Sequence, residues 1–321
     1  MDQCFAFWLQ NSTSWSEGNS RLDDAINDSA QTSSTDPSKS FRVNMTSFKW
    51  LVPLLLIPLV AIVANYVLFT GVSTPGTDFG TGSMFDQIAP RYDFVNRAMA
   101  VNMDIGWRKV MVQRIKERVP ESPMLIDVAT GTADVALLLA DAMPSAQILG
   151  VDPSQNMLAH GQDKITEQQK SSKITLQHAS VEDLGSILEP STYNGATMAF
   201  GIRNVADRPY GLCQIRRVLK QGGVLGILEF SEPDESFGVM GYLAKLFIRY
   251  IAPTAGAFLS GKPKEYLHLQ NSIQHFPTPV EFGNMMENLQ CPESVTTGAF
   301  RLERLQHLNF GSVQLYVATA V

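Results

Sequence analysis

The stretch DVATGTAD, residues 127–134, places an acidic residue at the end of an apolar run and continues through small residues into VALLLA. A strand, a flexible turn and a helix in this order are typical of the first βα unit of a parallel sheet. In such a unit the turn and the helix N-terminus bring backbone N–H groups toward a ligand. We therefore expect a ligand site here, with Asp127 at the strand end and Gly131 allowing close backbone approach.

Short apolar runs alternate with helix-like segments in the rest of the chain. The runs are MLIDVA (124–129), QILGVD (147–152), ITLQHA (174–179), ATMAFG (196–201) and GVLGILEF (223–230). Strands that are buried on both faces have nearly continuous apolar sequences, and alternation with helices indicates βαβ units. The pattern predicts an α/β fold with a doubly wound, mostly parallel sheet.

The composition limits the classes of function. The 321 residues are 45% hydrophobic and carry a net charge of -6, which suits a globular protein and disfavours a nucleic-acid partner. The cysteines Cys4, Cys213 and Cys291 are far apart and form no CxxC pair, so we expect a reducing compartment and no disulfide. The histidines are scattered and no HExxH spacing occurs, so we expect no catalytic metal.

The N-terminal part has a different character from the rest. Residues 1–48 are rich in Ser, Asn, Asp and Thr, which predicts a disordered extension. Residues 49–70 contain an uncharged run of about the length that crosses a hydrocarbon core, so they are expected to be a transmembrane helix or signal anchor. Residues 71–83 are expected to be a linker, and residues 84–321 a globular domain.

Other interpretations of the apolar run are open. It could be a buried core helix, or the apolar region of a cleaved signal if the chain starts at Met45. The membrane interpretation predicts a single-pass membrane protein, in the mitochondrial inner membrane or a plastid. A second apolar segment, residues 237–259, could line a lipid-tail site, lie at a membrane interface or form a buried lid helix.

The end of the second predicted strand suggests the type of ligand. Asp152 stands where an acidic residue binds the diol of a ribose, although it could also be a solvated acid or a helix cap. The phosphate-binding pattern GxGxxG is incomplete, because Ala129 and Ala133 stand where glycines are usual. An acid at the tip of the first strand disfavours a pyrophosphate and suits a cationic ligand such as S-adenosylmethionine. A nicotinamide cofactor is the alternative.

Several motifs resemble those of the ubiquinone/menaquinone biosynthesis C-methyltransferase family. They are YDFVNRAMAVNMDIGW (92–107), FGIRNV (200–205), RVLKQGGVLGILEFS (217–231) and EYLHLQNSIQHFPTPVEFGNMM (265–286). The resemblance implies a methyltransferase domain over residues 84–321, with the seven-stranded Rossmann-like sheet of class I S-adenosylmethionine-dependent enzymes. The chain departs from the family pattern at Ala133, where glycine is usual, and at Asp104, where histidine is usual. These departures bear on cofactor affinity and on substrate orientation.

The resemblance also implies a reaction. The methyl group of S-adenosylmethionine would pass to a ring carbon of a polyprenylated quinol, of the 2-methoxy-6-polyprenyl-1,4-benzoquinol or demethylmenaquinol type. Expected partners are this quinol, the membrane and other quinone-biosynthesis enzymes. A methyltransferase of a tocopherol-like or sterol-like acceptor and a non-catalytic scaffold of a quinone-synthesis complex are the alternatives.

Cofactor-binding residues follow from the resemblance and from the physical argument about the first turn. The resemblance implies contacts from Thr132 and Asp152, from Ser180 and Val181 near the adenine, and from Ala199. Asp127 and Gly131 join them because they form the strand end and turn described above.

Candidate catalytic residues lie in two of the motifs. Arg203 and Asn204 directly follow the fourth predicted strand, where they could hold a ring oxygen and stabilise its charge. Tyr92 and Asp93 are candidates for polar contacts with the ligands, with Asp93 a possible base, or both could simply shape a turn. Glu229 either faces the site or is structural.

Overall fold

The computed structural model describes residues 48–72, 82–291 and 299–321, with side chains described from Leu59 onward. The fold below is that of the compact unit Leu51–Val321. Its strands are β1 (Met124–Val128), β2 (Gln147–Asp152), β3 (Ile174–His178), β4 (Tyr193–Ala199), β5 (Leu219–Phe230), β6 (Phe300–Leu308) and β7 (Val313–Ala320).

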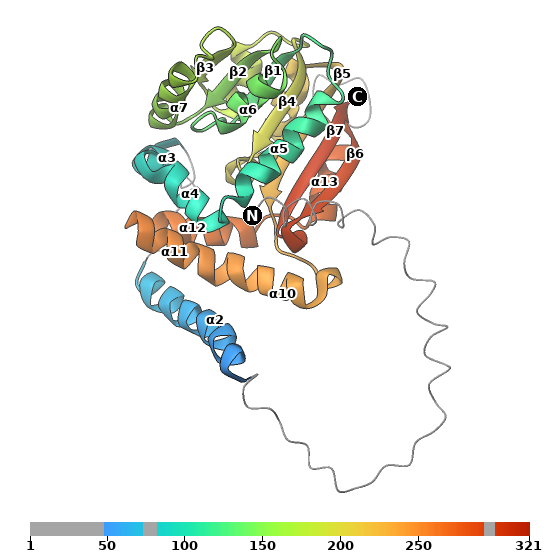
Figure 1. The fold of residues 1–321 in the computed structure, drawn as a ribbon. Coiled ribbons are helices and arrows are strands. Elements are labelled where there is room, and N and C mark those ends of the chain that lie inside the picture. Colours follow the sequence, from blue (N-terminus) through green and yellow to red (C-terminus); the bar gives the residue numbers. More distant parts are fainter. Residues whose placement is uncertain (1–47, 73–81, 292–298) are drawn as a thin grey trace, which may run out of the picture. The chain divides into compact units, whose positions relative to one another are not determined.

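The strands form one seven-stranded sheet of order β3-β2-β1-β4-β5-β7-β6. Strands β1 to β5 are parallel to one another, and β7 runs antiparallel to both β5 and β6. The prediction of a doubly wound, mostly parallel α/β fold is confirmed (Figure 1). The order reverses between β1 and β4, and ligands of such sheets bind beyond the strand ends at this switch point.

Helices cover both faces of the sheet and its carboxyl edge, except α2, whose hydrogen bond is to α11. The helices of the chain are α2 (Phe48–Phe69), α3 (Gly82–Ile88), α4 (Tyr92–Ala100), α5 (Met103–Lys116), α6 (Asp134–Ala142), α7 (Gln155–Glu167), α8 (Leu184–Ile187), α9 (Arg208–Val218), α10 (Gly238–Leu246), α11 (Ala252–Ser260), α12 (Pro263–Gln274) and α13 (Pro279–Glu287). Short helical segments join some of them, including η3 (Ile202–Asn204) after β4 and η5 (Phe247–Ile251) between α10 and α11.

Two apolar cores result from the alternation of side chains along the buried strands. Leu125 packs with α5, α6 and α7 on one face, and its neighbour Ile126 packs with α8, α9 and α13 on the other. Both residues are almost fully buried. Consecutive side chains of a strand point to opposite faces, so a parallel strand between two helical layers must be apolar at every position.

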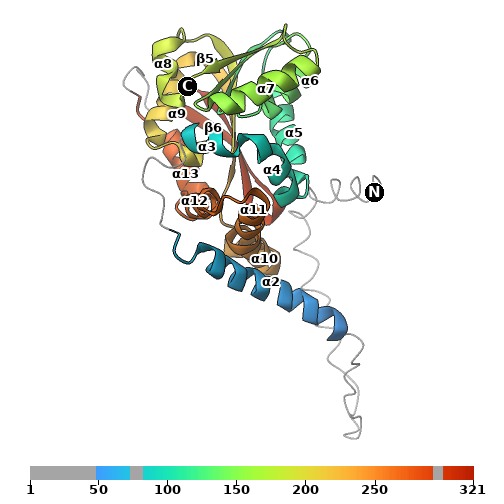
Figure 2. The same cartoon turned by 90° about the vertical axis from the view of Figure 1, so that its left-hand side faces the viewer.

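The α3–α4 segment lies across the carboxyl edge of the sheet, beside α11 and α12 (Figures 1 and 2). Its docking is partly polar, because Asp86 Oδ1 accepts hydrogen bonds from Ser154 Oγ at 2.6 Å and from the Asn156 N–H at 2.9 Å. Ile88 packs against Met157 of α7. These contacts hold the N-terminal segment over the first residues of α7.

The expected transmembrane helix corresponds to α2. Within the described part of the chain, no helix combines the length and the apolar character that crossing a membrane requires. Asn65 of α2 is buried and donates a hydrogen bond to Thr254 Oγ1 of α11 at 3.2 Å. The prediction of a single-pass membrane location is therefore wrong.

Other predictions for the N-terminal part are not tested by the structure. The disordered extension over 1–48, the alternative start at Met45 and most of the linker over 71–83 lie outside the described residues. The described globular unit includes α3, which begins at Gly82, close to the predicted boundary at residue 84.

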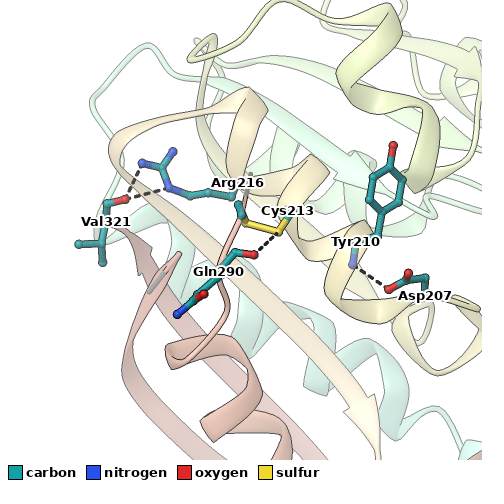
Figure 3. The surroundings of a disulfide bond; sticks show 7 residues. Asp207, Tyr210, Cys213, Arg216, Gln290 and Val321 are labelled. Carbon is teal, nitrogen blue, oxygen red and sulfur yellow. Dashed lines mark hydrogen bonds between the residues drawn. A yellow bond between two sulfur atoms is a disulfide. The ribbon is translucent and has the colours of Figure 1, made fainter. Parts of the chain in front are cut away.

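The prediction that the chain has no disulfide is wrong. Cys213 of α9 is bonded to Cys291, which follows α13, with a Cα–Cα distance of 5.4 Å (Figure 3). The two cysteines are 78 positions apart, so their spacing in the sequence gives no sign of the pairing. They meet because α9 and α13 pack on the same face of the sheet. The inferred reducing compartment loses its basis as well.

We expect the double change Cys213→Ser and Cys291→Ser to lower the free energy of unfolding by about 2–4 kcal/mol, because the bond constrains a long loop of the unfolded chain. Urea unfolding with and without a reductant measures this difference. The variant Cys4→Ser is the control and should unfold like the wild type. Equal midpoints for oxidised and reduced protein would contradict the expectation.

Candidate active site

A cavity of about 170 Å³ opens at the carboxyl ends of β1, β2 and β4. Its wall contains residues from the ends of these strands, from the α3–α4 segment and from the start of α7. They include Gly82, Phe85, Tyr92, Ala129, Gly131, Asp152, Met157, Ser180, Val181, Glu182, Ala199, Phe200 and Asn204. The cavity therefore lies at the switch point of the sheet, where the sequence predicts the ligand.

The turn after β1 forms one wall of this cavity. Ala129, Gly131 and Ala133 all have positive φ values, of 53°, 56° and 64°. An alanine in this region costs more than a glycine, so the chain tolerates strain here to keep the turn tight. The Ala133 methyl is fully buried outside the cavity wall, close to Gly161 of α7. It does not occlude the turn.

Asp152 ends β2 and lines the cavity beside this turn. Its Oδ2 accepts a hydrogen bond from the Gly131 N–H, and its Oδ1 accepts one from the Ser154 N–H, both at 2.8 Å. Burial, opposed by these hydrogen bonds, raises the pKa of Asp152 to about 6. An ionised Asp152 retains acceptor lone pairs and suits a ligand with paired hydroxyls, such as a ribose.

Two predicted cofactor residues do not reach the cavity wall. Asp127 is buried under the turn, where Thr130 and Thr197 each donate a hydroxyl hydrogen bond to it at 2.6 Å. Burial raises the pKa of Asp127 to about 6. Thr132 donates its hydroxyl to Asp93 of α4 at 2.7 Å. In this structure the side chains of Asp127 and Thr132 form hydrogen bonds with other protein groups and do not line the cavity.

The remaining predicted cofactor residues line the cavity. Ser180 and Val181 follow β3, and Ala199 ends β4. Ser180 forms a capping box with Asp183, so this carboxylate is engaged locally. Glu182, its neighbour, is part of the cavity wall.

A second cavity of about 80 Å³ adjoins the first, and Tyr92 and Phe200 line both. Its wall is mainly apolar and aromatic, with contributions from α4, α5, η5, α11 and α12. Trp107, Phe200 and Phe230 form an aromatic cluster in it, with ring centroids of the two phenylalanines 4.6 Å apart. Such a slot favours a flat apolar ligand.

Arg203 lines the second cavity and is 9% exposed. Its Nη1 donates to Glu229 Oε1 at 2.7 Å and to the Phe200 carbonyl at 2.6 Å, and its backbone N–H donates to Glu229 Oε2. Its Nε–H is buried and has no hydrogen-bond partner among the described residues. Glu229 is thus the buried ion-pair partner that holds Arg203. Of the two roles expected for Glu229, the structure supports the structural one.

Asn204 lines the first cavity and is held by a residue that the sequence analysis did not single out. His268 Nε2 lies 3.0 Å from Asn204 Oδ1. Burial and the nearby charge of Arg203 lower the pKa of His268 to about 4, so this histidine is neutral near pH 7. His268 lies in the motif of residues 265–286, which gives no local sign of its contact with Asn204. The contact forms because α12 packs against η3.

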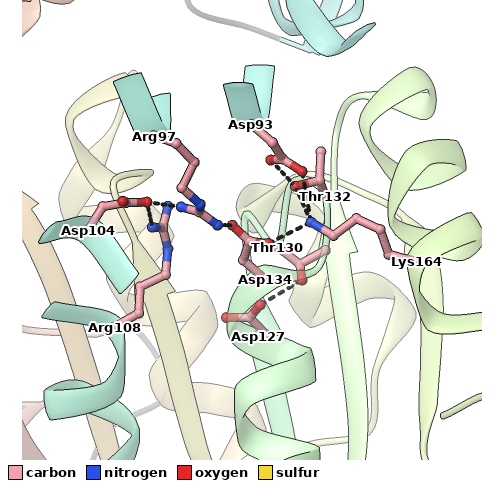
Figure 4. Close-up of polar contacts among 9 residues, drawn as sticks. All are labelled: Asp93, Arg97, Asp104, Arg108, Asp127, Thr130, Thr132, Asp134 and Lys164. Carbon is pink, nitrogen blue, oxygen red and sulfur yellow. Dashed lines mark hydrogen bonds and ion pairs between the residues drawn. The ribbon is translucent and has the colours of Figure 1, made fainter. Parts of the chain in front are cut away.

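Tyr92 and Asp93 are neighbours on α4 but point to different surroundings. Tyr92 lines both cavities, and burial raises its pKa, so it acts as a hydroxyl and not as a phenolate. Asp93 forms an ion pair with Lys164 Nζ at 2.8 Å (Figure 4). Asp93 is not part of either cavity wall, so the structure does not place it as a base.

An ion-pair network surrounds this contact and joins α4 to the turn after β1 and to α6 (Figure 4). Lys164 also pairs with Asp134 at 2.5 Å, and Arg97 pairs with Asp134 and with Asp104. Arg108 is a further partner of Asp104. Asp104 and Arg108 are four residues apart on α5, but the other pairs join different helices, so no local sequence pattern indicates them.

The chain is similar to known methyltransferases in sequence. The model of the family described as the ubiE/COQ5 methyltransferase family matches residues 77–296. A ubiquinone/menaquinone biosynthesis C-methyltransferase UbiE of Syntrophotalea carbinolica is 38% identical over 75% of this chain and 94% of its own length. A demethylmenaquinone methyltransferase of Bacteroides fragilis is 33% identical over 74% of this chain and 90% of its own.

Solved structures agree with the fold. A protein of Methanococcus maripaludis assigned to the S-adenosylmethionine-dependent methyltransferases superposes with a TM-score of 0.50 at 11% identity, covering 78% of this chain and 97% of that one. At this identity the likeness shows the fold alone.

We expect the affinity for S-adenosylmethionine to fall about tenfold between about pH 7.5 and pH 5, because protonation of Asp152 near pH 6 removes acceptor lone pairs from the ribose site. Isothermal titration calorimetry at several pH values measures this loss. The variant Asp152→Asn should bind more weakly at pH 7.5 and show a flatter profile. If the variant keeps the wild-type pH profile, the titrating group is not Asp152, and Asp127 becomes the candidate.

Proposed function

The chain belongs to the ubiE/COQ5 methyltransferase family, and on this basis we infer that it is a C-methyltransferase of quinone biosynthesis. It uses S-adenosylmethionine as its cofactor. The acceptor is the ring of a polyprenylated quinol. The observation that carries this inference is the match of the family model to residues 77–296, which include every residue that lines the first cavity and most of those that line the second.

The first cavity fits the cofactor. When bound, S-adenosylmethionine supplies an electrophilic methyl group on a sulfonium sulfur. Asp152 would hold the ribose hydroxyls, and the backbone around Gly131 would approach the cofactor closely. Ser180 and Val181 would border the adenine. The chain offers a carboxylate at the expected strand end and a tight turn beside it, and both suit this ligand.

The second cavity suits the acceptor ring. Its aromatic wall offers flat apolar contacts, and Phe200 and Tyr92 connect it to the cofactor cavity. Arg203 would donate its free Nε–H to a ring oxygen and stabilise the negative charge that develops there. A more negative oxygen raises the electron density of the ring carbon that attacks. Placement of the two ligands supplies the rest of the rate enhancement.

Asn204 would support the same chemistry from the boundary of the first cavity. His268 engages its Oδ1, which orients the side-chain amide and leaves the NH₂ group for another acceptor. Because His268 is neutral near pH 7, it holds this amide without adding charge beside Arg203. The tocopherol-like, sterol-like and scaffold alternatives are not favoured by the relatives.

A lipid surface is the second proposed partner. Val239, Tyr242 and Phe258 of α10 and α11 are 75%, 63% and 81% exposed. Lys245 and Arg249 both pair with Glu232, which offsets one of their two positive charges. The intervening segment η5 lines the acceptor cavity, so the apolar face is continuous with the site of a lipid-tailed substrate.

Cations border this apolar face and favour an anionic bilayer. Lys262 and Lys264 are exposed directly after α11, next to the apolar residues of its last turn. Apolar side chains with neighbouring cations are typical of surfaces that lie on a membrane interface. Contact with other quinone-biosynthesis enzymes stays a prediction.

The purified protein should transfer a labelled methyl group to the ring carbon of a short-tailed methoxybenzoquinol or demethylnaphthoquinol, as measured by mass spectrometry. The variant Arg203→Lys keeps the charge opposite Glu229 but lacks the Nε–H. We expect its kcat to fall about 10²-fold with little change in cofactor affinity. A wild-type kcat in Arg203→Lys would contradict the role of the Arg203 Nε–H as a donor to the ring oxygen. Failure of the wild type to methylate any quinol would contradict the proposed function.

The wild type should sediment with vesicles that contain phosphatidylglycerol and less with pure phosphatidylcholine vesicles. We expect Phe258→Glu to weaken vesicle binding about tenfold. The change replaces an apolar side chain that would be buried in the lipid interface with a charged one. Val280→Glu is the matched control, since Val280 is 65% exposed but lies on α13. Equal binding by the two variants would contradict the assignment of the surface.

A further inference from the structure

Two residues in the wall of the second cavity each have a buried polar atom without a hydrogen-bond partner among the described residues. These atoms are the Nε–H of Arg203 and Oδ1 of Asp104. Arg203 is 9% exposed and Asp104 only 3%. An unpaired buried polar group typically costs about 1–3 kcal/mol, so two in one small cavity indicate that a ligand pairs with them.

The two atoms have opposite hydrogen-bonding character. The Arg203 Nε–H can only donate, whereas a carboxylate oxygen of Asp104 can only accept. Ion pairs hold the other oxygen of Asp104, Oδ2, because Arg97 and Arg108 both donate to it. The free Oδ1 therefore stays available to a donor in the cavity, and its side chain is fixed by two guanidinium groups.

The aromatic cluster connects these two polar groups. The Arg108 guanidinium, which holds Asp104, lies 5.2 Å from the Phe200 ring centroid. The Arg203 guanidinium lies 5.8 Å from the centroid of Phe230, the ring packed against Phe200. A flat ligand against these rings would thus meet an acceptor and a donor belonging to the same wall.

We propose that Asp104 contacts the acceptor ring and makes the site selective for its reduced form. Asp104 Oδ1 accepts a hydrogen bond from one ring hydroxyl, and the Arg203 Nε–H donates to another ring oxygen. A quinol satisfies both atoms. A quinone carries only acceptor oxygens, so one of its carbonyls would face the carboxylate without a hydrogen and be repelled. This inference rests on the proposed function, which places the acceptor ring in the second cavity.

The same contact assists the reaction. A hydroxyl that donates to a carboxylate holds its proton less tightly and releases electron density into the ring, while the proton remains shared between the two oxygens. Arg203 stabilises charge at the other oxygen. The selectivity follows a general asymmetry, because a site built to pair with a hydroxyl strongly rejects an analogue that lacks it.

The test compares the affinities of a short-chain methoxybenzoquinol and its quinone for the full chain, with S-adenosylhomocysteine present to prevent turnover. We expect the wild type to bind the quinol at least about 100-fold more tightly than the quinone. In Asp104→Asn the amide oxygen should stay with Arg97 and Arg108 and turn the NH₂ group into the cavity. In this variant the ratio of quinol affinity to quinone affinity should fall at least about tenfold, because the acceptor in the cavity is replaced with a donor.

Two further variants separate selectivity from folding. Lys164→Gln weakens the same ion-pair network but leaves both partners of Asp104 in place, so it should lose stability but keep the quinol preference. Asp104→Glu keeps an acceptor and should keep the direction of the preference. Equal wild-type affinities for quinol and quinone, or an unchanged preference in a folded Asp104→Asn protein, would overturn the inference. If the wild type still methylates the quinol in that case, the proposed function stands and only the role of Asp104 falls.

Discussion

The active edge of the sheet depends on the buried ion pair between Arg203 and Glu229. Glu229 at the end of β5 is fully buried and receives hydrogen bonds from the side chain and the backbone of Arg203, which follows β4. Removing one partner of such a pair leaves an uncompensated charge and typically costs about 3–5 kcal/mol. The pair fixes the guanidinium on one side, so the remaining Nε–H has a defined place in the wall of the second cavity.

A second set of charges connects the two cavities. Arg97 pairs with Asp134, the first residue of the helix after the cofactor turn, and with Asp104 of the acceptor cavity. Lys164 links Asp134 to Asp93 on α4. The α4 segment is therefore held to the turn after β1 by groups that also hold Asp104, a carboxylate of the second cavity.

Sequence patterns located the site but not the role of each residue in it. Gly131, Asp152 and Ser180 line the cavity as expected, because residues at the carboxyl ends of adjacent parallel strands meet at one edge. Asp127 and Asp93 do not line it, since neighbouring threonines and Lys164 engage them. Those partners lie on other elements, and no local pattern specifies which side of a turn or helix faces the ligand.

The sequence by itself determined the layered α/β architecture, the position of the cofactor turn and the family. Each depends on short-range order: apolar runs of strand length, small residues after a strand, and motifs of contiguous residues. Only the tertiary structure decided the Cys213–Cys291 disulfide, the contact of His268 with Asn204 and the free oxygen of Asp104. These features arise where elements far apart in the chain pack together, so the distance between partners is set by the fold and not by their spacing in the sequence.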